Sequence, residues 1–244
     1  MITTHPSIVL MRPRQAAAAD IESSIRAGWQ PLLMEYQQLL PFDDILQQLA
    51  ERSLKQDVIV WVSPSAVHIA AKYLVQSDNV MHVAVGAATA KVLVAYGFKQ
   101  VVYPLDGNDS EAVLRLAIWH QKNGRMMLIR GVGGRELLVD KLGQQGWQVE
   151  LAEVYERQPQ LLNWSVLTQP LKEKRLKAVY MTTSAAVNAW FSQMPPDLYA
   201  IGKSLLYLVH HPRVEAALSS YDVATMLVSD LQRGLEILHS DSTV

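Results

Sequence analysis

The stretch Gly28-Trp29-Gln30-Pro31-Leu32-Leu33-Met34-Glu35-Tyr36 recurs, with one residue added, as Gly146-Trp147-Gln148-Val149-Glu150-Leu151-Ala152-Glu153-Val154-Tyr155. Each copy begins 16 residues after an arginine that closes an apolar run, Arg12 in the first case and Arg130 in the second. Two patterns that recur at equal spacing indicate an internal duplication with a period of about 118 residues. That period is the length of a small domain, so the sequence predicts two similar halves.

Short apolar runs alternate with helical patterns along the rest of the chain. Such runs are typical of buried parallel strands, and their alternation with helices predicts the α/β class. The last helix is expected to run from about Tyr221 to Leu238. The expected strands lie near residues 8–11, 57–62, 80–85, 101–103, 126–129, 178–181 and 199–201.

The two halves also align where strands are expected to end. Residues 62–67 (Val-Ser-Pro-Ser-Ala-Val) match 182–187 (Thr-Thr-Ser-Ala-Ala-Val), and 83–86 (Val-Ala-Val-Gly) match 199–202 (Tyr-Ala-Ile-Gly). Ligands of parallel sheets bind beyond the carboxyl ends of the strands, where helix N-termini offer unpaired N–H groups and partial positive charge. The junctions therefore favour a site for an anionic ligand.

Each candidate residue at these junctions has a second interpretation. Hydroxyl residues at helix starts are ordinary caps, which explains Ser63 and Thr183 as well as a binding role does. Arg12 and Arg130 either bind a ligand or are solvated. Tyr155 either packs in the interior or, if it faces the site, donates a proton, because a phenol is protonated at neutral pH.

Composition excludes several classes of protein. The chain has 244 residues, half of them hydrophobic, and a net charge of -1, which does not favour nucleic-acid binding. The absence of cysteine excludes disulfides and cysteine nucleophiles. No apolar run reaches the roughly 18 residues of a membrane helix, and residues 1–6 lack the features of a signal peptide. A cytoplasmic protein is expected.

Two further motifs are weak. Gly131-Val132-Gly133-Gly134 follows an expected strand, but Glu136 stands where a dinucleotide-binding loop would have its third glycine. A nucleotide-dependent reductase is therefore a minor alternative. His210 and His211 are adjacent and cannot share one helix face, so no metal site is expected.

In the order and spacing of its motifs, the chain resembles the uroporphyrinogen-III synthase family over nearly its full length. The resemblance implies two flavodoxin-like parallel-sheet domains joined by a two-stranded linker, with a cleft between them. It places the first domain at 1–30 plus 160–244, the second at 37–150, and the linker strands at 31–36 and 151–159. The matching segments are 9–13 (Val-Leu-Met-Arg-Pro), 62–67, 85–90 (Val-Gly-Ala-Ala-Thr-Ala), 128–131 (Leu-Ile-Arg-Gly), 134–135, 154–155 and 182–187.

The resemblance also implies a reaction. The family cyclises the linear tetrapyrrole hydroxymethylbilane to uroporphyrinogen III, with inversion of ring D and loss of water, and is a lyase of porphyrin and heme biosynthesis. No metal or organic cofactor is expected, nor a nucleic-acid or membrane partner. A monomer is expected, and a contact with the preceding pathway enzyme stays open. The substrate carries eight carboxylates, which suits the anion-binding junctions.

The resemblance carries roles onto particular residues. Tyr155 matches the family's tyrosine and is the expected general acid. Two departures weaken individual contacts: Leu205 replaces a threonine of the family pattern, and Pro64 lacks an N–H group. The alternative from another class is a non-enzymatic two-domain binding protein for a small polyanion. The expected substrate-binding residues are Arg12, Ser63, Gly86, Thr89, Arg130, Gly131, Thr183, Ser184, Gly202 and Ser204.

Overall fold

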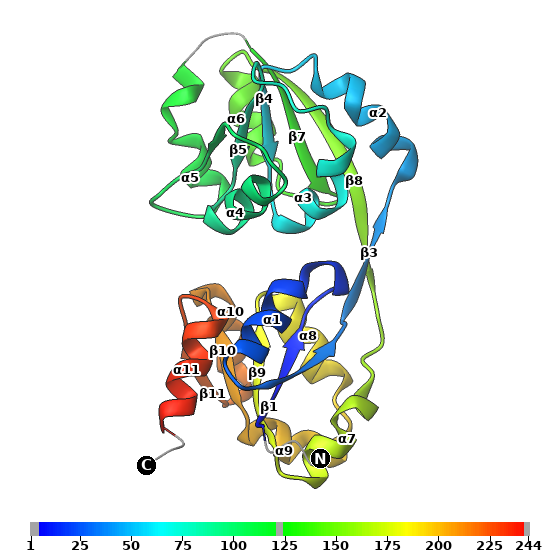
Figure 1. Cartoon of the computed structure of the whole chain (residues 1–244), viewed down its shortest axis with the longest axis vertical. Coiled ribbons are helices and arrows are strands. Elements are labelled where there is room, and N and C mark those ends of the chain that lie inside the picture. Colours follow the sequence, from blue (N-terminus) through cyan, green and yellow to red (C-terminus); the bar gives the residue numbers. More distant parts are fainter. Residues whose placement is uncertain (1–4, 121–123, 242–244) are drawn as a thin grey trace. The chain divides into compact units, whose positions relative to one another are not determined.

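The computed structural model describes residues 5–120 and 124–241 (Figure 1). The chain forms two compact units. Unit 1 comprises Met1–Gln38 and Gln158–Val244, and unit 2 comprises Leu39–Arg157. No helix of the described ranges is long and apolar enough to cross a membrane.

Unit 1 contains a five-stranded sheet in which every neighbouring pair is parallel. Read from β2, the strands follow the order 2-1-3-4-5 along the unit's own sequence, which is the order of flavodoxin-like folds. In spatial order the strands are β2 (Gln30–Met34), β1 (Ser7–Met11), β9 (Leu176–Met181), β10 (Leu206–Val209) and β11 (Ala224–Leu227).

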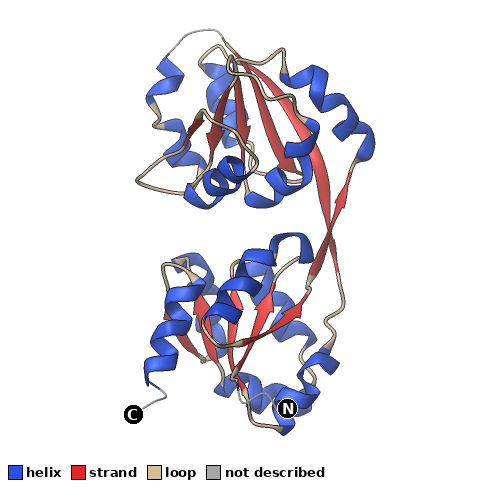
Figure 2. Ribbon diagram, in the orientation of Figure 1, coloured by secondary structure: helices blue, strands red, loops and turns tan. Residues whose placement is uncertain are grey.

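Helices cover both faces of this sheet, as Figure 2 shows in blue and red. Ile8 and Leu10 of β1 face a core that includes Leu231 and Leu235 of α11, while Val9 and Met11 face a core that includes Trp190 of α8. The helices of unit 1 are α1 (Ala18–Arg26), α7 (Thr168–Lys172), α8 (Ser184–Gln193), α9 (Tyr199–Ser204), α10 (Pro212–Leu218) and α11 (Leu231–Asp241), with 3-10 turns at Arg14–Ala16, Trp164–Leu167, Pro196–Leu198 and Ser219–Tyr221.

Unit 2 repeats this arrangement. The order β8-β7-β4-β5-β6 corresponds strand for strand to β2-β1-β9-β10-β11 of unit 1, and β3 pairs with β8 as an additional edge strand. The shared strand order agrees with the duplication predicted from the repeated stretch. The strands are β3 (Gln37–Pro41), β8 (Gln148–Pro159), β7 (Arg125–Gly131), β4 (Val58–Trp61), β5 (Met81–Ala84) and β6 (Val101–Val102).

The sheet of unit 2 is likewise buried on both faces. Met127 and Ile129 of β7 face a core that includes helices α2, α3 and α4, while Met126 and Leu128 face a core that includes α5 and α6. These helices are α2 (Asp43–Ser53), α3 (Pro64–Ala70), α4 (Ala87–Ala95), α5 (Ser110–Leu114) and α6 (Leu137–Gln144), with 3-10 turns at Ala71–Tyr73 and Ala117–His120.

The residue added in the second copy of the repeat shifts the register between two paired strands of unit 2. β1 and β2 pair in register to Met11 and Met34, whereas the register of β7 and β8 shifts after Arg130 pairs with Glu153. Gly131 then pairs with Tyr155, so Val154 is an extra residue in β8. A residue added to one strand re-aims the side chains that follow it.

Three details differ from the sequence prediction. Residues 199–204 are helical and the strand is β10, because the buried apolar run is Leu205–Val209 rather than 199–201. The expected final helix 221–238 contains a strand, β11, before α11. The expected linker strand 31–36 is instead mostly β2 of the unit 1 sheet, and the unit boundary falls within β3.

Candidate functional site

The strand order locates a candidate site in each unit. In a sheet of order 2-1-3-4-5, the crevice lies beyond the carboxyl ends of the two strands whose connections leave in opposite directions. In unit 1 these are β1 and β9, which are followed by Arg12 and Thr182. In unit 2 they are β7 and β4, whose carboxyl ends lie at Gly131 and just before Ser63.

Arg12 links the two strand ends of unit 1. Its Nη1 donates to Thr182 Oγ1 at 2.8 Å, its Nη2 donates to the carbonyl of Ala16 at 3.0 Å, and its Nε lies 3.0 Å from Asp20 Oδ2. Burial raises the pKa of Asp20, and the Arg12 guanidinium opposes that rise. The side chain of Arg12 is 20% exposed. Its charge is therefore compensated within unit 1, which favours a structural role over a ligand-binding one.

Thr183 caps the helix that follows β9. Its Oγ1 accepts from the backbone N–H of Ala186 at 3.1 Å and lies 3.0 Å from the hydroxyl of Tyr36. The cap interpretation thus holds for Thr183. Ser184 is the first residue of α8. The N-terminus of α8 still offers positive electrostatic potential to an anion.

Ser63, Gly86 and Thr89 occupy helix starts in unit 2. Ser63 Oγ accepts from the N–H of Ala66 at 3.2 Å and caps α3, with Pro64 as the first helical residue. Gly86 is the N-cap of α4, and a Cβ there would lie 2.8 Å from Cβ of Asn108. Thr89 is buried in the first turn of α4. Gly86 is therefore required by the close approach of Asn108.

Arg130 is buried, with 4% of its side chain exposed. It donates to Glu153 (3.2 Å), to Glu136 (2.6 Å) and to the carbonyls of Gly134 and Arg135 (both 3.1 Å). Two carboxylates compensate its charge, and its nitrogens are already bonded. Like Arg12, it fastens the loop after its strand.

Tyr155 is 1% exposed and packs in the core of unit 2. Its ring lies against Gly131, where a Cβ would be 2.5 Å from the ring carbon Cε2. Its hydroxyl accepts from Arg157 Nη2 at 3.0 Å. Its own proton has no acceptor among the hydrogen bonds of the described residues. The structure thus brings Tyr155 and Gly131 together at one strand end.

Gly202 and Ser204 are not at a strand end, so the prediction that placed them in the site for that reason is wrong. Both lie in α9, before β10 begins. The carbonyl of Gly202 accepts from the buried hydroxyl of Tyr207 at 2.8 Å, and Ser204 donates to the carbonyl of Ile201 at 2.8 Å.

The strand end that Gly202 was expected to form lies after Val209 instead. There His211 caps α10, with its Nδ1 accepting from the N–H of Arg213 at 3.0 Å. The sequence signal that could have found it is Pro212, since proline favours the first turn of a helix.

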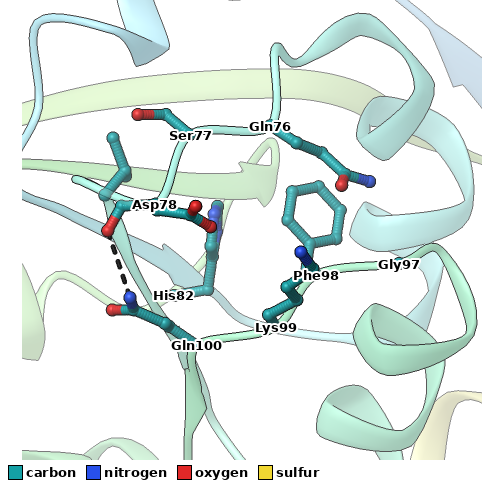
Figure 3. A pocket seen from close by; sticks show the side chains of 9 residues that line it. Gln76, Ser77, Asp78, His82, Gly97, Phe98, Lys99 and Gln100 are labelled. Atoms are coloured by element: carbon teal, nitrogen blue, oxygen red, sulfur yellow. Dashed lines mark hydrogen bonds between the residues drawn. The ribbon is translucent and has the colours of Figure 1, made fainter.

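A hollow of about 220 Å³ lies elsewhere in unit 2, at the amino ends of β5 and β6 (Figure 3). Figure 3 shows Asp78, His82, Lys99 and Gln100 around it. Burial lowers the pKa of His82 to about 4, and Trp61 donates to its Nδ1 at 3.1 Å. No group of three or more potential metal ligands occurs in residues 5–120 and 124–241.

The two units share one order of five parallel strands, and each has a compensated arginine and a capped helix at its crevice. These features define a protein of two flavodoxin-like units. The family model described as "Uroporphyrinogen-III synthase HemD" matches residues 20–233, across both units. The chain belongs to the uroporphyrinogen-III synthase family. The resemblance predicted from its motifs is therefore confirmed.

Individual relatives agree with this assignment. A uroporphyrinogen-III synthase of Escherichia coli (strain K12) is 32% identical over 164 residues, which are 62% of this chain, and the chain spans 65% of that relative's length. A uroporphyrinogen-III synthetase from Helicobacter pylori 26695 has a similar fold, with TM-score 0.58 and 14% identity over 98% of this chain and 100% of that chain. A mutant uroporphyrinogen III synthase from the extremely thermophilic bacterium Thermus thermophilus has TM-score 0.56 and 17% identity over 96% of this chain and 98% of that one. At these identities the likeness to the two structures supports a shared fold and nothing more. That fold agrees with the predicted two-domain α/β class.

Proposed function

We propose that this chain is a uroporphyrinogen-III synthase, a lyase that closes hydroxymethylbilane to uroporphyrinogen III with inversion of ring D and loss of water. The observation that carries the proposal is the family match over residues 20–233, which includes strand ends of both units. The related enzyme of Escherichia coli bears the same name. This match favours the enzyme over a non-enzymatic polyanion-binding protein.

The chemistry of the strand ends supports the same proposal. A substrate with eight carboxylates needs N–H groups and positive potential, and the N-termini of α4 and α8 supply both at strand ends. Holding the ends of a flexible chain in one geometry contributes several kcal/mol to a ring closure, on the order of 7–11 in the best cases. Thr89 lies in the first turn of α4, Thr183 and Ser184 form the start of α8, and Ser63 caps α3. Their direct contact with substrate stays a prediction.

Tyr155 is the proposed proton donor. As the bond between the terminal methylene carbon and its hydroxyl oxygen breaks, the bond electrons go to the oxygen. The phenol O–H supplies the proton that converts the departing group into water. General acids of this kind contribute about 10²–10⁴ in rate. Arg157 already donates to the phenol oxygen, so the phenol proton is directed elsewhere.

The test is the isomer composition of the product. Purified protein is mixed with hydroxymethylbilane, and the oxidised products are separated into type I and type III. We expect type III in excess over a protein-free control. Type I alone, formed at the spontaneous rate by folded protein, would contradict the proposal. Tyr155→Phe, which preserves the packing of the ring, is expected to lower the rate of type III formation about 10²–10⁴-fold.

We also propose that the protein acts as a cytoplasmic monomer on a small-molecule substrate. The support is its family membership and a near-zero net charge, which does not favour a nucleic-acid partner. Light scattering gives the molar mass directly, and a dimer mass would contradict the monomer. Pull-down with the enzyme that forms hydroxymethylbilane tests the contact with the preceding step.

A further inference from the structure

The arginines at the two crevices differ in how their charge is balanced. Arg12 is paired with Asp20, and Arg130 is paired with Glu136 and Glu153. Arg157 is exposed on β8 and has no carboxylate partner within residues 5–120 and 124–241. An uncompensated guanidinium binds an added anion more strongly than one whose charge is already neutralised.

Two neutral oxygens hold Arg157 in place. Its Nη2 donates to the Tyr155 hydroxyl at 3.0 Å, and its Nη1 donates to the carbonyl of Val132 at 3.4 Å. Its Cζ lies 5.2 Å from the centroid of the Tyr155 ring. Side chains two positions apart on a strand point to one face, which places this guanidinium over the phenol. These bonds orient the cation without cancelling its charge.

Arg157 also lies beside the phenol of the buried Tyr155. The tyrosine is 1% exposed, with Gly131 against its ring and Arg157 over it. A ligand that reaches the phenol therefore meets the guanidinium. Guanidinium and carboxylate form paired, charge-assisted hydrogen bonds about twice as strong as those between neutral groups. A carboxylate can thus displace the weak 3.4 Å bond to Val132.

We propose that Arg157 binds a carboxylate of the substrate beside Tyr155 and so positions the reacting end of the tetrapyrrole against the phenol. This inference rests on the proposed function. It assigns the anion-binding arginine of unit 2 to Arg157 rather than to Arg130, whose nitrogens are occupied by Glu136, Glu153 and two carbonyls.

Steady-state kinetics of type III formation test the assignment. Arg157→Gln is expected to raise KM about tenfold and to lower kcat, because one carboxylate contact and its alignment are lost. Arg157→Lys keeps the charge but lacks the planar pair of donors. Its KM should therefore lie between those of the wild type and Arg157→Gln. The matched control is Arg125→Gln, which removes the same charge from an exposed residue at the opposite end of the sheet and should change neither constant.

A binding measurement separates this role from a structural one. Uroporphyrin III, the stable oxidised product with the same eight carboxylates, is titrated into Tyr155→Phe and into Tyr155→Phe/Arg157→Gln. We expect about tenfold weaker binding in the double variant, through the lost charge-assisted bonds, and unchanged thermal midpoints, since Arg157 is exposed. Unchanged KM, kcat and affinity in a protein that makes type III would overturn the assignment of Arg157. A wild-type protein that makes no type III would instead overturn the proposed function.

Discussion

The crevices of unit 1 and unit 2 begin from the same pattern and differ in one added residue. Arg12 directly follows β1 and Arg130 lies next to the end of β7, and each fastens the loop that follows its strand. Tyr36 then bonds to the cap residue Thr183, whereas Tyr155, displaced by Val154, lies against Gly131 beneath Arg157. A single insertion has changed the surroundings of an equivalent tyrosine while the strand order stayed the same.

The residue that follows each arginine also differs between the two units. Unit 1 has Pro13 and unit 2 has Gly131, and only the missing Cβ of Gly131 leaves room for the Tyr155 ring. The duplicated arginines and caps thus serve the structure of both units. The proton transfer is proposed for Tyr155, which lies where the two copies of the repeat differ. Variants in matching positions of the two units test that division.

The largest expected effect is from the buried arginine of unit 2. Arg130→Met removes the donor from two backbone carbonyls and the cation from two carboxylates, so we expect a loss of about 3 kcal/mol in the stability of unit 2. Arg12→Met should cost about half as much, because Arg12 is paired with one carboxylate and Arg130 with two. Urea unfolding with hydrogen exchange assigned to each unit measures both, and equal losses would show that the two arginines are equivalent.

Gly131→Ala tests the close approach that is specific to unit 2. The new Cβ would lie 2.5 Å from the ring of Tyr155, which is buried in the core, so we expect about 2 kcal/mol of destabilisation and loss of type III formation. The matched change in unit 1, Pro13→Ala, introduces no larger side chain and should leave product formation intact. A fully active Gly131→Ala enzyme would contradict the proposed role of Tyr155 in this position.

Acid should destabilise unit 2 more than unit 1. The indole N–H of Trp61 donates to buried His82, and the corresponding strand of unit 1 carries Tyr207, which accepts from Trp190. The pKa of His82 falls from 6.5 to about 4 on folding, so between these values the unfolded state binds more protons. Stability therefore falls as the pH falls, by about 2 kcal/mol from pH 7 to pH 5.

Burial raises the pKa of Tyr207, so this residue does not titrate in the same range. Burial also lowers the pKa of His210 in unit 1, but by less than that of His82, so unit 2 stays the more acid-sensitive of the two. Urea unfolding at pH 7 and pH 5 measures the difference, and His82→Asn should remove most of the pH dependence. If the free energy of unfolding of His82→Asn falls between pH 7 and pH 5 as much as that of the wild type, the acid sensitivity belongs to another group.

The smallest expected effect concerns the helix caps. Thr183→Ala and Ser63→Ala each remove one cap bond, at a cost of about 1 kcal/mol. The threonine variant also loses its contact with Tyr36 and should cost about 0.5 kcal/mol more. Thr183→Ser keeps both bonds and is the matched control. If the two alanine variants cost the same, the Tyr36 bond contributes nothing to stability.

Much of the fold could be predicted from the sequence. Runs such as residues 57–62 are largely apolar because the strands of a parallel sheet are buried on both faces. The same rule failed at 199–209, where the first short apolar run, 199–201, belongs to α9 and only the second contains the strand β10. Periodicity does not distinguish a buried strand from a buried helix turn over so few residues.

The candidate site was predicted less completely. Ser63 and Thr183 are at strand ends, as expected, and both are caps. The chemical state of an arginine depends on neighbours such as Glu136 and Asp20, which lie on a different turn or helix. No local pattern distinguishes a compensated guanidinium such as Arg130 from an uncompensated one such as Arg157.

The sequence by itself determined the duplication, the α/β class and the family, because these depend on the order and spacing of residues along the chain. Only the tertiary structure decided which arginine has its charge compensated by a carboxylate and which tyrosine lies against a glycine. Charge compensation and close packing are set by distances between side chains in space, which their spacing along the sequence does not give. The added Val154 is visible in the sequence, but its effect on Tyr155 follows from the pairing of β7 with β8.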